Sequence, residues 1–364
     1  MSIQFKIVSN KQELSAFYRI SNEVYKNIPL HRSTEEDITK LLIEGPSAFH
    51  QHASVSPYLI TRGSKTVGRF ALINDTHLPQ YIQVSFFEAL PDLYGIDTLI
   101  IELARKEFPD STKIVFGLNG HLNYGAGFLL NKYNQPPVFG LPYTPEYYTE
   151  YFKNLKMRKM VSFRFSTLPF FDYLDKMGDH PDLKGITVRK LNKKKLKEET
   201  ALYTYLNNSC FPDHPFWANR EVMEDFELFH PFRFLIREEN LLFAEKDGNA
   251  IGFFLWYPDF NELVKGPQPL GVRHVLKYKW FNPIKTFRFT EIAVLQKYQV
   301  SHAVQAMILC AIKYIRKMGI EQGEGGFIFE ENIRSISMTK RFLQRVSGEK
   351  MEAYRQYAVF EKEL

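Results

Sequence analysis

The sequence Thr286-Phe-Arg-Phe-Thr-Glu-Ile-Ala-Val294 is followed by a polar connection, Leu295 to Ser301, and then by the segment His302 to Met318. The first of these is rich in β-branched and aromatic residues, which predicts a buried strand. In the last segment apolar residues recur at helical spacing, and Gly319 follows as a stop signal. A strand that leads into a helix N-terminus gathers unpaired backbone N–H groups, and the helix dipole there favours an anion such as a pyrophosphate.

A second strand and a second helix come directly after this unit. Gly326-Phe-Ile-Phe329 is short and apolar, and Glu330-Glu-Asn332 separates it from a helix that we expect to end near Val346. Asn332 has two possible roles. One is to cap this helix, which its position just before the helix favours; the other follows from the resemblance described next. The order strand, loop, helix, strand, helix carries most of the functional signal in the chain.

This layout resembles the acetyl-CoA-binding core of the GNAT acetyltransferase superfamily. There the loop after the fourth strand has the pattern Gln/Arg-x-x-Gly-x-Gly/Ala and holds the pyrophosphate, and an asparagine at the later turn often contacts coenzyme A. The matching loop here is Gln299-Val300-Ser301-His302-Ala303-Val304, in which His302 and Val304 replace small residues that let a phosphate approach the backbone. The resemblance implies acetyl-CoA as co-substrate, bound by Val294, Gln299, Val300, Ser301, His302, Ala303, Val304 and Asn332.

Composition and charge narrow the class of protein. A chain of 364 residues is long for one hydrophobic core and suits two domains. The net charge of +6 favours acidic partners, and a polyanionic cofactor such as coenzyme A would suit it. The basic cluster from Arg189 to Lys197 lacks interleaved aromatic residues, which argues against a nucleic-acid partner. Aromatic residues make up 15% of the chain, which predicts thick cores or an aromatic-lined groove.

The cysteines and the hydropathy pattern bear on the compartment. Cys210 and Cys310 are the only cysteines, and neither has a neighbour at metal-ligand spacing, so we predict free thiols and no metal site. The chain begins with a strand-like run, Met1 to Val8, rather than a basic and then apolar leader. No apolar run approaches the length of a membrane span. We therefore expect a cytoplasmic protein without a membrane partner.

The order of predicted elements occurs twice along the chain. Val67-Gly68 in a first hairpin matches Ile251-Gly252 in a second, and Asn10 before one helix matches Asn192 before another. In the first copy we also predict a helix over Thr144 to Leu155. The repeat predicts an N-terminal domain at residues 1–167, a linker at 168–182 and a C-terminal domain at 183–364, although one large α/β domain is the alternative.

Fragments from both copies support a resemblance across the whole chain. They include Asn131-Lys-Tyr-Asn-Gln-Pro-Pro137, Leu141-Pro-Tyr-Thr-Pro-Glu-Tyr-Tyr148, Tyr257-Pro-Asp-Phe-Asn261 and Tyr354-Arg-Gln-Tyr357. In order and spacing they resemble a family of mostly uncharacterised bacterial proteins with two GNAT-like domains in tandem. The resemblance implies an α/β fold with mixed sheets, two acyl-CoA N-acyltransferase-type domains and an N-acetyltransferase activity. The loop Glu88 to Gly95 lacks the cofactor pattern, so we predict that only the second domain binds acetyl-CoA.

Transfer of an acetyl group to an amine requires a base, a donor to the thioester oxygen and a proton for the leaving thiolate. Glu291 is the candidate base, because some GNAT enzymes place a glutamate on this strand; the alternative is a carboxylate that points to solvent. Many relatives carry a general-acid tyrosine seven residues after the asparagine, and here that position is Thr339. His302 has two readings as well, a loop residue of a working site or a side chain that fills the pyrophosphate space.

The sequence therefore predicts an N-acetyltransferase whose small-molecule or peptide amine acceptor lies between the two domains. Two alternatives stay open. One is a non-catalytic binder that kept the fold and lost the chemistry, which the replacements at His302, Val304 and Thr339 favour. The other is an aminoacyl-transferase of the type used in peptidoglycan synthesis. The identity of the acceptor and the oligomeric state do not follow from the sequence.

Overall fold

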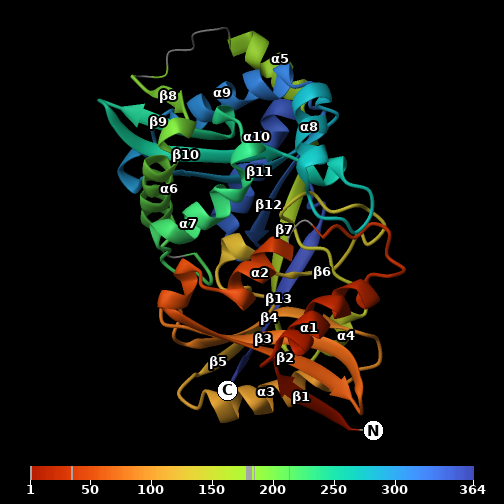
Figure 1. The fold of residues 1–364 in the computed structure, drawn as a ribbon. Helices are drawn as coiled ribbons and strands as arrows, with labels where there is room; N and C mark the ends of the chain where they lie inside the picture. The colour runs from red at the N-terminus through yellow and green to blue at the C-terminus, as the bar shows by residue number, and fades with distance from the viewer. Residues whose placement is uncertain (1, 34–35, 178–182, 184, 213) are drawn as a thin grey trace.

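A computed structural model describes residues 2–33, 36–177, 183, 185–212 and 214–364, and its described strands join into one mixed sheet (Figure 1). The first half of the chain contributes β1 (Ile3–Ile7), β2 (Ala53–Arg62), β3 (Lys65–Asp75), β4 (Tyr81–Ala89), β5 (Lys113–Phe116), β6 (Phe128–Leu129) and β7 (Lys156–Ser166). The second half contributes β8 (Thr187–Lys190), β9 (Leu241–Lys246), β10 (Asn249–Pro258), β11 (Thr286–Val294), β12 (Gln322–Phe329) and β13 (Gln356–Glu363).

Helices cover the faces of this sheet (Figure 1). In the first half they are α1 (Lys11–Val24), α2 (Glu36–Glu44), α3 (Ile96–Glu107), α4 (Tyr148–Tyr151) and α5 (Leu168–Met177). In the second half they are α6 (Leu196–Cys210), α7 (Val222–Phe229), α8 (Val272–Phe281), α9 (Ala303–Lys317) and α10 (Ile333–Ser347). Their order is similar in the two halves, except that α8 lies between β10 and β11 while β3 leads directly into β4. Asn10 accepts hydrogen bonds from two backbone N–H groups at the start of α1, and Asn192 caps the turn before α6, which confirms the paired capping signals.

Both halves contain two parallel strands that pair briefly and then diverge. Tyr81 to Val84 of β4 pair with Lys113 to Phe116 of β5, and Thr286 to Phe289 of β11 pair with Gln322 to Gly325 of β12. β5 ends with these four pairs, whereas β4 continues without it to Ala89. In the second half both strands continue beyond the pairing, so a gap opens between β11 and β12. The register of β10 against β11 also shifts at this point, and Thr290 is the unpaired residue of the resulting bulge.

The two halves exchange their last strands. The sheet order places β13 between β5 and β7, and β7 between β13 and β12. Thus the C-terminal strand pairs with the first half, as Phe360 opposite Phe116 shows, while β7 pairs with the second half, as Phe163 opposite Gly325 shows. In Figure 1 the C-terminal strand runs down among the elements of the first half, and both termini lie at that end. The exchange makes one continuous sheet from the two halves.

The gap beyond β4 and β5 is filled by aromatic side chains. The Phe87 ring lies 5.3 Å from the Tyr148 ring and 5.2 Å from the Phe152 ring. Glu88 accepts a hydrogen bond of 2.6 Å from the Tyr148 hydroxyl, and burial raises the pKa of this carboxyl to about 6. The helix predicted over Thr144 to Leu155 is wrong over most of its length. Only the four residues of α4 are helical, because this segment instead places its tyrosines into the gap.

The predicted linker begins with a helix. α5 occupies residues 168–177, and its Phe170 and Leu174 are buried in the core that α9 also forms. Residues 178–182 lie outside the described residues, so the predicted boundaries at 168–182 stay a prediction. Because α5 has an apolar face, residues 168–177 pack against α9 as a helix and do not form an extended linker.

The strand exchange predicts that residues 1–167 do not fold cooperatively when produced alone, because both neighbours of β7 in the sheet belong to the second half. Urea unfolding followed by circular dichroism measures this. As a control, a protease site placed at residues 178–182 of the full chain should yield two pieces that stay associated after cleavage. A sharp two-state transition of the isolated piece 1–167 would contradict the exchange.

Candidate functional site

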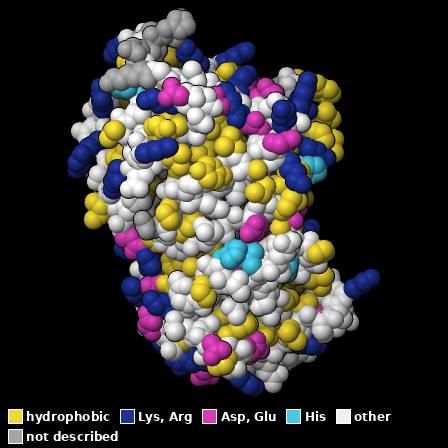
Figure 2. All heavy atoms as spheres, turned by 90° about the vertical axis from the view of Figure 1, so that its left-hand side faces the viewer, with side chains coloured by type: hydrophobic (Ala, Val, Ile, Leu, Met, Phe, Trp, Pro, Cys, Tyr) yellow, Lys and Arg dark blue, Asp and Glu magenta, His cyan; other side chains and the backbone are white. Residues whose placement is uncertain are grey.

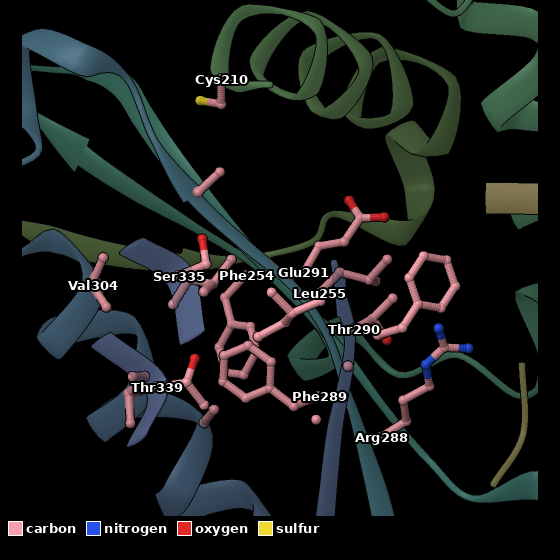
Figure 3. Close-up of a pocket in the computed structure, with 18 of the residues that line it drawn as sticks. Cys210, Phe254, Leu255, Arg288, Phe289, Thr290, Glu291, Val304, Ser335 and Thr339 are labelled. Atoms are coloured by element: carbon pink, nitrogen blue, oxygen red, sulfur yellow. The ribbon is translucent and has the colours of Figure 1, made fainter. Parts of the chain in front are cut away.

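A cavity of about 1530 Å³ opens where β11 and β12 diverge (Figure 3). This exceeds the roughly 300–1,000 Å³ of ordinary small-molecule pockets. It reaches from the α9 and α10 side of the sheet to the α6 and α7 side, and it includes Leu122 to Gly125 from the first half. Its walls are mainly aromatic and aliphatic. The aromatic lining includes Phe163, Phe165, Phe170, Tyr203, Phe211, Trp217, Phe229, Phe232, Phe254, Phe289 and Phe342.

Glu291 directs its carboxylate into this cavity on the α6 side of β11. Its Oε2 accepts hydrogen bonds from the Tyr203 hydroxyl at 2.9 Å and from Asn207 Nδ2 at 2.5 Å, both on α6. Burial and the nearby Glu291 charge hold the pKa of Tyr203 well above its usual range, so the tyrosine stays a hydrogen-bond donor. No described residue bonds to Oε1 of Glu291. The two helix residues therefore fix the carboxylate and leave one oxygen for a substrate.

The bulge in β11 decides on which face each side chain lies. Figure 3 shows Glu291 and Arg288 on one side of the strand, with Phe289, Ser335 and Thr339 on the other. Successive strand residues normally alternate between faces, and the extra residue Thr290 keeps this alternation from continuing unchanged.

Most of the predicted cofactor residues line the cavity. These are Val294, Gln299, Ser301, His302, Val304 and Asn332. Two do not line it: Val300 is 99% exposed on the outer surface, and Ala303 is fully buried at the start of α9. The physical reason is that the chain turns as it enters α9. Successive side chains therefore point in different directions: one to solvent, one into the core and others to the cavity.

The start of α9 is suited to a phosphate. Ser301 Oγ accepts from the Ala303 N–H at 3.3 Å, while His302 makes no capping hydrogen bond to the helix. The His302 ring bends back to Gln305, with 3.2 Å between Nδ1 and Oε1. Arg334 of α10 donates to the Gln299 side chain at 2.9 Å, which brings a cation to the same edge of the cavity. The N-terminus of α9 and the guanidinium of Arg334 are groups that could together bind the pyrophosphate of coenzyme A.

α10 presents hydroxyl groups at Ser335 and at Thr339, the position where the family resemblance leads one to expect a tyrosine. Asn332 Oδ1 accepts from the Ser335 N–H at 3.0 Å, so the expected capping role of Asn332 is present. The Ser335 and Thr339 side chains face the cavity (Figure 3). A threonine hydroxyl is too weak an acid to replace a tyrosine directly, but either hydroxyl can hydrogen-bond to a ligand in the cavity.

Sequence reasoning missed three polar residues of this site. Tyr203 and Asn207 come from α6, about 85 residues before Glu291 in the chain, and only the fold brings them together. Arg288 is 8% exposed and lines the cavity; its Nη1 donates to the Phe139 carbonyl at 3.2 Å and to the Tyr257 hydroxyl at 3.1 Å. One signal was available for Arg288, because a charged residue inside a predicted buried strand requires a special reason.

A second polar cluster lies where α7 meets the first half. His52, Asp75 and His77 form the one group of possible metal ligands found among the described residues, and Figure 2 shows histidine side chains gathered at this junction. The His52 and His77 rings stack at 3.9 Å with only 12° between their planes. Lone pairs in nearly parallel rings do not converge on one ion. His52 Nδ1 instead lies 2.8 Å from Asp75 Oδ1, so we assign no metal here.

Comparisons with known proteins support the fold. No protein-family model matches the chain. The bacterial ceramide synthase of Caulobacter vibrioides is 22% identical over 352 residues, which covers 90% of this chain and 88% of that protein. Protein YghO of Escherichia coli is 21% identical over 376 residues, with 98% and 94% covered.

Among solved structures, a tandem GNAT protein from the clavulanic acid biosynthesis pathway matches with a TM-score of 0.56 and 13% identity, covering 100% of this chain and 98% of that one. A conserved protein of Enterococcus faecalis, described as a probable N-acyltransferase, matches with a TM-score of 0.53 and 8% identity, covering 100% and 73%. The chain thus has the tandem GNAT fold that its sequence predicted.

A buried carboxyl next to the cavity, that of Asp259, should make the stability of the protein depend on pH. Asp259 Oδ1 accepts from the N–H of Phe139, a cavity residue, at 2.8 Å, and burial raises the pKa of Asp259 from 3.8 to about 7. Between about pH 4 and pH 7 the folded protein then keeps a proton that the unfolded chain has lost, so its free energy of unfolding falls as the pH rises. The variant Asp259→Asn, which keeps the acceptor oxygen, should lack this component.

Urea unfolding of both proteins across this range isolates the effect, because other titrating groups such as Glu88 are common to both. We expect the free energies of unfolding of the wild type and of Asp259→Asn to diverge progressively with pH. Parallel curves would show that Asp259 titrates normally.

Proposed function

We propose that this protein is an N-acyltransferase that transfers an acyl group from acyl-CoA to the amine of an acceptor with a long hydrocarbon chain. One observation carries the proposal. A single large apolar cavity reaches both sides of the sheet through the gap between β11 and β12, and the carboxylate of Glu291 lies inside it. The fold relatives and the ceramide synthase named above support the same class of reaction.

The donor would enter from the α9 and α10 side. Leu295 N–H bonds to the Ile251 carbonyl on β10, so the preceding N–H, that of Val294, points the other way, towards the gap. That N–H is positioned to donate to the thioester oxygen, and Arg334 with the start of α9 would bind the phosphates. Deeper in the cavity, apolar residues between the sheet and the helices offer space for an acyl chain: Phe165, Phe170, Ile308, Ile312, Ile315, Phe342 and Leu343.

The acceptor would enter from the α6 and α7 side. Tyr203, Phe211, Trp217, Phe229 and Phe232 line this part of the cavity. Such a wall disfavours a strongly polar acceptor and suits a hydrocarbon chain, because burial of apolar surface drives its binding. The name of the Caulobacter relative points to the same chemistry, since a ceramide is an N-acylated long-chain amino alcohol.

The chemistry assigned to the residues is direct. The amine nitrogen attacks the thioester carbon, a C–N bond forms, the C–S bond breaks and coenzyme A leaves as a thiolate. Glu291 takes the proton that the amine loses, through the Oε1 that has no described partner. A thiol has an ordinary pKa of about 8.5, so its thiolate leaves without a strong acid, and the Ser335 and Thr339 hydroxyls lie where they can hydrogen-bond to it.

The proposal leaves two other readings that experiments separate. A non-catalytic binder would bind acyl-CoA or the acceptor and form no product. An aminoacyl-transferase would require aminoacyl-tRNA and would bind RNA. Acetyl-CoA is the shortest donor that the site would accept, and the length of the apolar wall favours longer ones.

We predict that Glu291→Gln lowers kcat for amide formation by about 10²- to 10⁴-fold, because the amine loses its base while the shape of the site is kept. Mass spectrometry of the amide formed from palmitoyl-CoA or acetyl-CoA and a long-chain amino alcohol measures this. The matched control is Glu331→Gln. Glu331 also lines the cavity, but its carboxylate pairs with Arg158, so its kcat should change little.

Palmitoyl-CoA should give the higher kcat/KM of the two donors. If Glu291→Gln and Glu331→Gln lose kcat equally, Glu291 is not the base. If calorimetry detects acyl-CoA binding but no donor yields an amide, the binder reading holds instead. Binding to the intact protein that is lost in Gln299→Ala with Ser301→Pro would locate the cofactor at the start of α9.

A further inference from the structure

Helix α8 presents apolar residues to solvent. Val272, Leu276 and Trp280 are 77%, 40% and 72% exposed, and their spacing of four residues places them along one line of the helix. His274 and Tyr278 are buried on the opposite side. The exposed line is therefore distinct from the face that packs on the protein. Phe281, at the end of the helix, is 76% exposed as well.

Basic residues flank this line. On a helical projection Arg273 and Lys277 fall on one side of it and Lys279 on the other, all three are exposed, and α8 contains no acidic residue. Lys279 Nζ lies 5.9 Å from the centre of the Phe234 ring, and Phe234 is 54% exposed. We call this surface the α8 patch: Val272, Arg273, Leu276, Lys277, Lys279, Trp280 and Phe234.

The inner face of α8 lies next to the cavity. The ring of Tyr278 contacts that of Phe260 with 5.5 Å between centroids, and Phe260 lies 5.3 Å from Phe139. Phe260 and Phe139 both line the cavity. Thus one layer of side chains separates α8 from the proposed acceptor side. In Figure 1 the helix lies at the outer edge of the second half, remote from both termini.

We propose that the α8 patch binds the surface of an anionic phospholipid bilayer. Tryptophan and other apolar side chains that are flanked by lysine and arginine are the signature of a helix that lies in the membrane interface. The charges also argue against a second copy of this chain as the partner. A symmetric contact would place the lysines and arginines of both copies together, and α8 has no acidic residue to oppose them.

Binding through the α8 patch would hold the protein at the bilayer surface and would not require a helix that crosses the membrane. Within the described residues no helix has both the length and the apolar character needed to cross a bilayer. The sequence predicted no membrane partner, because no apolar run approaches the length of a membrane span. The exposed line of α8 is recognised only once the fold shows which of its apolar residues are buried. Docking through α8 would bring the cavity next to a source of hydrophobic acceptors.

Flotation of the full-length protein with vesicles tests the proposal. One set contains phosphatidylcholine alone and the other contains phosphatidylcholine with phosphatidylglycerol. We expect at least about tenfold more binding to the anionic vesicles, falling as salt is added, since screening weakens the charged contacts. Leu276→Ser with Trp280→Ser should abolish binding, and Arg273→Gln with Lys277→Gln and Lys279→Gln should remove the preference for anionic lipid.

The matched control is Tyr94→Ser, because Tyr94 is also 72% exposed but lies in the first half before α3. It should bind vesicles like the wild type, and thermal unfolding should show that all variants are folded. Equal binding to both vesicle types, no binding to either, or equal loss in the Tyr94 control would overturn the proposal. So would a dimer in sedimentation equilibrium that Leu276→Ser with Trp280→Ser dissociates.

Discussion

The exchange of last strands is the constraint on which the rest of the structure depends. Backbone N–H and C=O groups in the middle of a sheet must pair, and β5 and β12 each find their next neighbour in the other half of the chain. The halves are thereby held edge to edge. This arrangement brings α7 onto the first half, where Glu227 accepts from the Ala48 N–H at 3.0 Å, and lets residues 122–125 close one wall of the cavity.

The gap between diverging strands is used differently in the two halves. Beyond β4 and β5, Phe87, Tyr148 and Phe152 fill the space, and a buried carboxyl, Glu88, satisfies two tyrosine hydroxyls. Beyond β11 and β12 the corresponding space is open. Close packing leaves no room for a ligand in the gap of the first half, so the candidate site lies in the gap of the second half. The same backbone device therefore yields a packed core in one half and a cavity in the other.

The two sides of the candidate site differ in charge: one holds a carboxylate and the other is positively charged. Glu291 requires donors to hold it inside an apolar cavity, and α6 supplies them through Tyr203 and Asn207. The proposed acyl-CoA side would instead need positive potential, which Arg334 and the start of α9 can provide. Between them lies the gap in the sheet. In the reaction that we propose, the thioester and the amine would meet in this gap, and their hydrocarbon chains would extend along separate walls.

The sequence by itself determined the local elements: the strand Thr286 to Val294, the helix caps at Asn10 and Asn332, and the position of Glu291 on a buried strand. Side-chain periodicity and capping act within a few residues, so they can be read directly. The helix predicted over Thr144 to Leu155 was wrong over most of its length. In this segment hydrogen bonds from tyrosine hydroxyls to distant groups outweigh the local helix propensity. Only the tertiary structure decided the exchange of strands, the α6 partners of Glu291 and the outward line of α8, since each depends on contacts between segments far apart in the chain.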